Sequence, residues 1–153
     1  MTNDKLEKGQ SLFEVVMALG VIAVITVGVV SLSVNAIRNA AFSKNKTLAG
    51  RYAQEATEWL RSQRDNDFNI FEDNVQTSPR CFPTTPLNWN GRVGTCLDAE
   101  KIPNTPLFRL ISFSTTTISG KIVIQADIKV YWTDAQGYHE ARSATSFTDW
   151  RQR

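Results

Sequence analysis

The feature that most constrains this chain is an interval near its N-terminus without a charged side chain. It runs from Val15 to Ile37, 23 residues of 153, and most of these residues are apolar. The hydrocarbon core of a bilayer requires about 20 such residues in an α-helix. Glu14 directly precedes the interval, and a carboxylate at the bilayer centre costs roughly 2.5 to 3.5 kcal/mol. The sequence therefore predicts a helix that can span a membrane, with a flanking acid that needs a partner.

Three interpretations of this interval compete. A cleaved secretory signal has a basic start, an apolar stretch of about 7 to 15 residues and a small-residue cleavage site. Residues 34–36 loosely offer such a site, but acidic and basic residues balance within 1–8 and the apolar stretch is too long. A plain single-pass anchor explains the length of the interval and leaves Glu14 without a role.

The third interpretation comes from a resemblance. The residues Lys8-Gly9-Gln10-Ser11-Leu12-Phe13-Glu14-Val15-Val16, with the apolar interval after them, resemble the prepilin leader of type IV pilins and type II secretion pseudopilins. The resemblance implies a leader over residues 1–9 that prepilin peptidase removes after Gly9, and a mature chain that begins at Gln10 and is methylated there. It also implies that Glu14, the fifth mature residue, acts in assembly. Two positions depart from the family pattern: Gln10 replaces the common Phe, and Ser31 stands where many pilins have a proline.

An apolar stripe continues beyond the interval at helical spacing. Its members are Ile37, Ala41, Leu48, Tyr52, Ala56 and Trp59, and the charged residues lie largely on other faces. This pattern predicts one helix from about Gln10 to Arg64, whose second half packs on a globular head. We therefore expect a transmembrane half over 10–37 and a head over 38–153, and the resemblance implies that the head is extracytoplasmic.

The segment after this helix is rich in proline and polar residues. The run Arg64–Asn69 favours an end to the helix, and an irregular connection is expected from about Asp65 to Thr105. Cys81 and Cys96, the two cysteines of the chain, lie within it. An even count in an extracytoplasmic, loop-rich segment indicates one disulfide bond, and two reduced thiols are the alternative.

From Leu107 onward the hydrophobic period changes to two. Apolar residues alternate with polar ones from Ile122 to Trp132, and turns are expected at 119–120 and 134–137. Strands over 107–117 and 138–148 complete an antiparallel sheet of about three strands. The fold class is therefore α+β, and the final hairpin also resembles that of minor pilins.

Motifs for catalysis and cofactor binding are not found. The chain has no G-x-S-x-G, no phosphate-binding glycine loop and no H-E-x-x-H, so we expect neither enzymatic activity nor a cofactor. His139 is its single histidine, and two cysteines do not make a zinc site. Asp65 and Asp67 lack the rest of a calcium loop. The net charge of +2 argues against a strongly electrostatic nucleic-acid partner.

These observations predict a structural subunit, a minor pilin or pseudopilin of a type IV pilus or type II secretion-like filament. Its expected partners are prepilin peptidase, other pilin subunits, the inner-membrane assembly machinery and membrane lipid. It is expected in the inner membrane before assembly and in a surface or periplasmic filament afterwards. Two alternatives stay open: a membrane-anchored module that binds a ligand through the proline-rich loop, and a DNA-uptake pilin that uses Arg142, Arg151 and Arg153.

Overall fold

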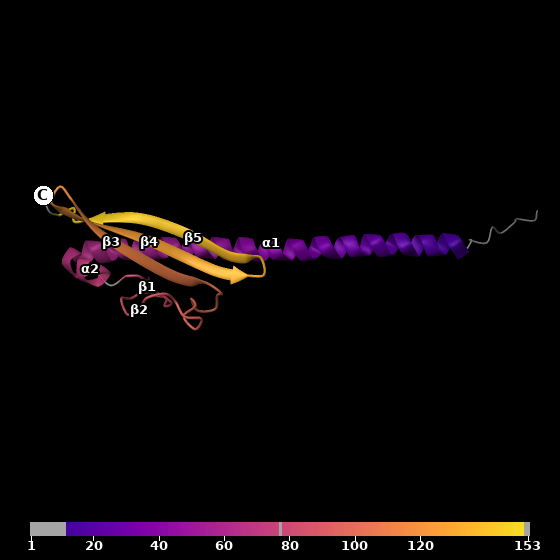
Figure 1. The fold of residues 1–153 in the computed structure, drawn as a ribbon, viewed down its shortest axis with the longest axis horizontal. Helices are drawn as coiled ribbons and strands as arrows, with labels where there is room; N and C mark the ends of the chain where they lie inside the picture. The colour runs from indigo at the N-terminus through magenta and orange to yellow at the C-terminus, as the bar shows by residue number, and fades with distance from the viewer. Residues whose placement is uncertain (1–11, 77, 152–153) are drawn as a thin grey trace, which may run out of the picture. The chain divides into compact units, whose positions relative to one another are not determined.

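The computed structural model describes residues 12–76 and 78–151. The chain divides into an N-terminal unit, Met1–Phe42, and a C-terminal unit, Ser43–Arg153. Helix α1, Leu12–Asn66, begins in the first unit and ends in the second. Its second part packs on a five-stranded antiparallel sheet of the C-terminal unit (Figure 1). The α+β fold predicted from the sequence is confirmed.

The end of α1 lies where the polar run predicted it, but the next segment is helical. Helix α2, Phe68–Val75, follows directly, and Asp67 is its N-cap. The Asp67 carboxylate accepts hydrogen bonds from the main-chain N–H groups of Asn69, at 2.9 Å, and Ile70, at 3.1 Å. The expectation of an irregular chain from Asp65 was therefore wrong for this stretch, because an aspartate that ends one helix can cap the next.

The sheet has the strand order β2-β1-β3-β4-β5, with every neighbouring pair antiparallel. The bounds are β1 Arg80–Cys81, β2 Arg92–Val93, β3 Phe108–Ile118, β4 Lys121–Asp134 and β5 Gly137–Thr148. The last three are the strands that the period-two pattern predicts, and β1 and β2 are short additions from the irregular segment. Ser119 and Gly120 have φ values of 52° and 78°, the left-handed conformation that a two-residue hairpin turn favours.

The core lies between α1, α2 and one face of this sheet. The α1 residues at its centre are Ala49, Ala53, Ala56 and Leu60, all nearly inaccessible to solvent. The larger side chains come from the sheet and α2, among them Trp132, Ile128, Phe147 and Phe71. Small residues on the helix thus leave space for large ones opposite, which keeps the interior densely packed.

The apolar stripe predicted for α1 marks one edge of its buried face. Leu48, Tyr52 and Trp59 are only partly buried and pack against the margin of the core. Ala56, a member of the predicted stripe, lies at the centre of this face, and the other central residues, Ala49, Ala53 and Leu60, each follow a member of the stripe by one residue. Ile37 and Ala41 belong to the N-terminal unit and are exposed.

We expect Ala53→Leu to destabilise the C-terminal unit. Ala53 is 3% exposed, and added methylenes in a packed core cost about 1 to 3 kcal/mol. Thermal unfolding of the full chain in detergent, followed by near-ultraviolet circular dichroism, measures the change. Gln54→Leu is the matched control, because Gln54 is the next residue of α1 and its side chain is exposed. Equal losses in the two variants would contradict the assignment of the buried face.

Candidate functional site

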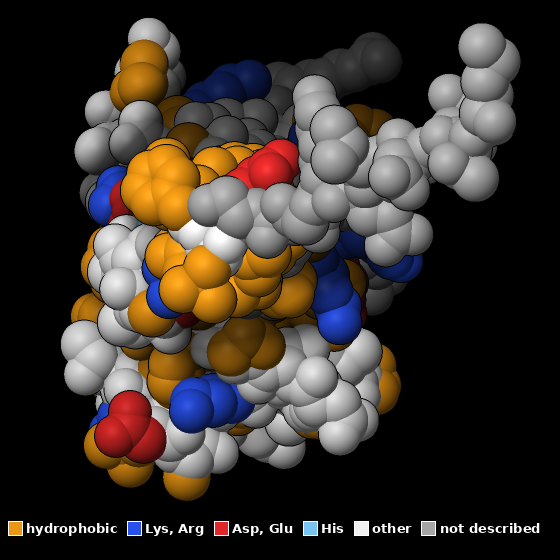
Figure 2. Space-filling view, turned by 90° about the vertical axis from the view of Figure 1, so that its right-hand side faces the viewer, with side chains coloured by type: hydrophobic (Ala, Val, Ile, Leu, Met, Phe, Trp, Pro, Cys, Tyr) orange, Lys and Arg blue, Asp and Glu red, His pale blue; other side chains and the backbone are white. Residues whose placement is uncertain are grey.

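The apolar segment of α1 has its side chains on the surface of the molecule. Every residue from Leu12 to Ile37 is exposed, and the segment is long and apolar enough to cross a membrane. Figure 2, which looks onto the molecule from its α1 side, shows hydrophobic side chains gathered there. A surface of this kind fits either a membrane anchor or a signal sequence.

Two polar side chains of the segment form hydrogen bonds within the helix. The Thr26 hydroxyl donates to the Ile22 carbonyl at 2.8 Å, and the Ser33 hydroxyl donates to the Val29 carbonyl at 2.9 Å. Such bonds to the residue four positions earlier are the usual way to compensate a hydroxyl where water is absent.

Glu14 lies in the first turn of α1. A negative charge there is favoured by the helix dipole. Among residues 12–76 and 78–151, no cationic group forms an ion pair with it. The predicted processing site, Gly9 and Gln10, lies outside the described residues, as does any contact that Glu14 makes with it.

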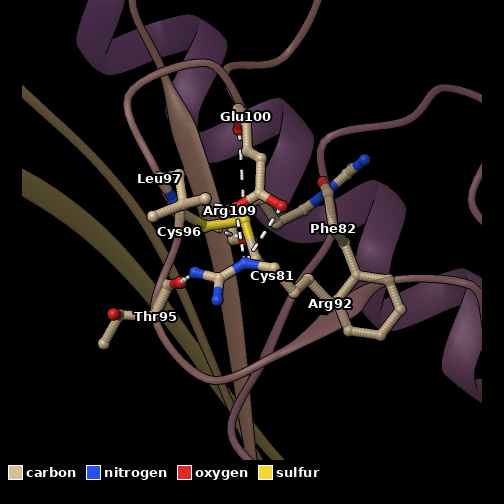
Figure 3. The surroundings of a disulfide bond; sticks show 8 residues. All are labelled: Cys81, Phe82, Arg92, Thr95, Cys96, Leu97, Glu100 and Arg109. Atoms are coloured by element: carbon tan, nitrogen blue, oxygen red, sulfur yellow. Dashed lines mark hydrogen bonds and ion pairs between the residues drawn. A yellow bond between two sulfur atoms is a disulfide. The ribbon is translucent and has the colours of Figure 1, made fainter.

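The second candidate site is the loop closed by a disulfide bond. Cys81 and Cys96 are joined, with their Cα atoms 5.1 Å apart, so the predicted bond is confirmed. The bond joins the end of β1 to the chain after β2 (Figure 3). In the chain-entropy estimate, a closed loop of about 15 residues contributes about 3 kcal/mol.

A charged network supports the same loop beside the disulfide. Arg92 pairs with Glu100, at 3.1 Å between Nε and Oε2, and also donates to the Thr95 carbonyl. The Leu97 N–H donates to Glu100 Oε2 at 2.7 Å. The Leu97 N–H, and after it Arg92, lower the pKa of the Glu100 carboxyl, which therefore stays ionised at neutral pH.

Arg109 connects this loop to α1 from a fully buried position. Its guanidinium donates to the Phe82 carbonyl at 3.1 Å, to the Thr84 carbonyl at 2.7 Å and to Glu55 Oε2 at 3.2 Å. Tyr52 adds a ring whose centroid lies 5.8 Å from the guanidinium carbon. Burial lowers the pKa of Arg109, and the Glu55 carboxylate acts in the opposite direction. One side chain thus holds helix, strand and loop together.

Sequence reasoning missed Arg109. The signal was present, because the alternation that places Ile111 inward also places residue 109 inward, where a charge requires partners. Its partner Glu55 lies 54 positions earlier, and nothing in the sequence joins the two.

Trp89 anchors the middle of the loop on the core. Its ring centroid lies 4.6 Å from that of Trp59 and 6.1 Å from that of Phe71. Its indole N–H donates to Gln63 Oε1 at 3.0 Å. The loop is therefore packed along α1 in its middle as well as at its ends.

The remaining candidate residues are used within the fold. His139 Nε2 lies 2.9 Å from Asp134 Oδ1 at the β4–β5 turn, and no cluster able to hold a metal ion occurs among the described residues. Asp67 is a helix cap and Asp65 bonds to Arg64 and Trp150.

Two of the three arginines predicted for DNA, Arg142 and Arg151, already bond within the fold. Arg142 pairs with Glu140 and Asp127, and Arg151 donates to the Asp65 carbonyl. Arg153 lies outside the described residues.

Comparisons with protein-family models, curated proteins and solved structures found no match. The architecture itself is pilin-like, since a long N-terminal apolar helix packs on an antiparallel sheet beside a disulfide-bonded loop.

Arg109→Met should lower the free energy of unfolding by at least about 2 kcal/mol. Two main-chain carbonyls lose their donor, and an unsatisfied buried acceptor costs about 1 to 3 kcal/mol. Glu55→Gln is the control, because its side chain is 35% exposed and the amide oxygen can still accept from Arg109. Chemical denaturation of both variants measures the difference, and a Met variant no weaker than the Gln variant would refute the role assigned to Arg109.

Proposed function

We propose that this chain is a structural subunit, a minor pilin or pseudopilin, of a type IV pilus or type II secretion-like filament. The observation that carries the proposal is the continuity of α1 from an exposed apolar segment to the helix that forms one wall of a disulfide-bonded head. A subunit of this kind is stored in the membrane by the apolar segment. It then enters the filament when the segment exchanges lipid for the apolar helices of other subunits.

Processing comes first in this proposal. Prepilin peptidase cuts after Gly9, and the new amino terminus at Gln10 is methylated. The amine is a positive charge at the start of the apolar helix. Glu14 of one subunit then pairs with the amine of a neighbour, so that neither charge remains alone in a low-dielectric environment. This pairing selects the stagger between adjacent helices.

The remaining partners follow from the same scheme. The inner-membrane assembly machinery extracts the subunit from lipid, and the C-terminal unit stays on the extracytoplasmic side. The protein therefore moves from the inner membrane to a surface or periplasmic filament, without a cofactor and without catalysis of its own.

Two other functions would use the same anchor differently. A binding module would remain in the bilayer and use its proline-rich loop, although Trp89 and Arg109 already engage that loop with the core. A DNA-uptake pilin would need arginines free to meet phosphate, whereas Arg142 and Arg151 already bond within the fold. A filament subunit accounts for more of these observations than either alternative function does.

The mature chain should begin at Gln10. Mass spectrometry of the intact protein, purified from cells that contain prepilin peptidase, measures this directly. Loss of residues 1–9, with one added methyl group, is the expected result. Gly9→Leu should abolish the cleavage, because the family's peptidase requires the glycine. A wild-type protein that retains Met1–Gly9 would refute the filament function and favour the anchored module.

Glu14→Gln should leave membrane insertion intact and reduce incorporation into filaments about tenfold or more. Loss of one partner from a buried ion pair costs about 3 to 5 kcal/mol, and each 1.4 kcal/mol corresponds to a factor of ten. The measurement compares this subunit in sheared filaments and in membranes. Glu58→Gln, which removes an exposed carboxylate of the same helix, is the matched control. Normal incorporation of the Glu14 variant would rule out the pairing.

A further inference from the structure

Chain connectivity limits how far the first residue of the C-terminal unit can lie from the end of the apolar segment. The unit begins at Ser43, six residues after Ile37. Six residues reach at most about 20 Å when fully extended. Whatever the orientation of the two units, the first residues of the C-terminal unit therefore lie near the surface of any membrane that the apolar segment spans.

The structure shows which part of the sheet lies beside those first residues. Lys46 Nζ donates to the Glu140 carbonyl at 2.8 Å, so the start of the unit contacts the beginning of β5. The β4–β5 turn at residues 134–137 is on this side, and the β3–β4 turn at Ser119 and Gly120 is at the opposite end of the same strands. We call the near side the β4–β5 end. Its exposed or partly exposed residues include Lys46, Lys101, Phe108, Lys129, Tyr131 and Tyr138, with the acids Asp98, Asp134 and Glu140, and Lys44 precedes Lys46 by two residues of α1.

Aromatic rings form a row across three strands at the β4–β5 end. The centroids of Phe108 and Tyr131 are 5.1 Å apart, and Tyr138 follows at 5.8 Å from Tyr131. Lys101 Nζ lies 5.5 Å from the Phe108 ring and Lys129 Nζ lies 5.4 Å from the Tyr131 ring. Tyrosines beside lysines, each with an apolar body and a polar tip, are the residues typical of a membrane–water interface.

Several cations near this end are available to an external anion. From Val15 to Gln54 the sequence has no acid and four cations, which are Arg38, Lys44, Lys46 and Arg51. Lys44, Lys101 and Lys129 form no ion pair with any carboxylate in the part of the chain that the structure describes.

Two of the acids at the β4–β5 end, Glu140 and Asp134, have partners within the fold. Glu140 accepts from Arg142 Nε at 2.6 Å and from the Tyr138 hydroxyl at 2.8 Å. Asp134 accepts from the Gln136 N–H at 2.8 Å and from Trp132 Nε1 at 3.3 Å. Burial, and then the bond to Glu140, raise the pKa of Tyr138 to about 12, so its hydroxyl stays neutral. The lysines at this end therefore face solvent together with one further exposed acid, Asp98.

We propose that the β4–β5 end of the C-terminal unit docks on anionic phospholipid headgroups while the subunit is stored in the membrane. Lys44, Lys101 and Lys129 meet lipid phosphates, and Tyr138 lies in the headgroup layer. This inference rests on the membrane anchor of the proposed function and extends it, because it assigns a lipid-binding surface to the head. Each lysine close to an anionic surface strengthens binding about fivefold.

The test uses the full chain in lipid nanodiscs and one fluorophore at a time. Because Cys81 and Cys96 are joined, an introduced cysteine is the single reactive thiol. Gln136→Cys places the fluorophore at the β4–β5 turn, and Ser119→Cys places it at the opposite turn of the same sheet. A spin label on the lipid headgroup quenches a fluorophore that lies close to it.

Quenching at residue 136 should exceed quenching at residue 119 by at least about twofold. This excess should be larger in phosphatidylglycerol discs than in phosphatidylcholine discs. The double variant Lys44→Gln and Lys101→Gln should reduce quenching in the anionic discs to the phosphatidylcholine level. The control, Lys121→Gln with Arg61→Gln, removes two charges elsewhere and should retain the excess.

Equal quenching at the two turns, or no dependence on anionic lipid, would overturn the proposed docking and leave the anchor intact. A protein that enters discs of neither composition would overturn the anchor and the docking together. Loss of the excess in both double variants would overturn the assignment to these lysines, because total charge alone would then explain the effect.

Discussion

The main-chain hydrogen bonds of α1 are the constraint on which the rest of this structure depends. A segment surrounded by lipid must satisfy its N–H and C=O groups internally, and a helix is the way for one chain segment to do so. The same helix, extended to Asn66, then forms one wall of a water-soluble core through Ala49, Ala53, Ala56 and Leu60. One regular element therefore carries two kinds of surface, because its side chains change from apolar on most faces to apolar on one face.

The sheet and the loop are joined to that helix by few but specific contacts. Large sheet residues such as Trp132 fill the space above the alanines, which explains why the helix contributes little volume of its own. Arg109 then ties the disulfide-closed loop to Glu55 of α1, and Trp89 ties it to Gln63. The loop has few regular main-chain hydrogen bonds. The Cys81–Cys96 bond, the Arg109 guanidinium and the Trp89 indole hold it in place instead.

The proposed function and the proposed lipid contact describe the same protein surfaces in two states, one in the membrane and one in a filament. In the membrane, lipid would cover the apolar segment and headgroups would meet the lysines of the β4–β5 end. In a filament, other subunits would replace both. A subunit that leaves the membrane must give up its lipid contacts, and contacts made mainly by exposed lysines are weak enough individually to be exchanged.

The sequence by itself determined the elements whose patterns are local. The uncharged interval, the one-sided stripe after it and the period-two strands from 108 to 148 each follow from the spacing of apolar residues, so their types and approximate bounds could be predicted. The two cysteines similarly indicated the bond between 81 and 96. Tertiary structure alone decided that Ala49 and Ala53 would join Ala56 at the centre of the α1 face, that Arg109 would pair with Glu55, and that Lys101, Lys129 and Tyr138 would share one end of the sheet. The physical reason is that these contacts join residues that are far apart in the chain, and their free energy depends on packing and desolvation that no local spacing encodes.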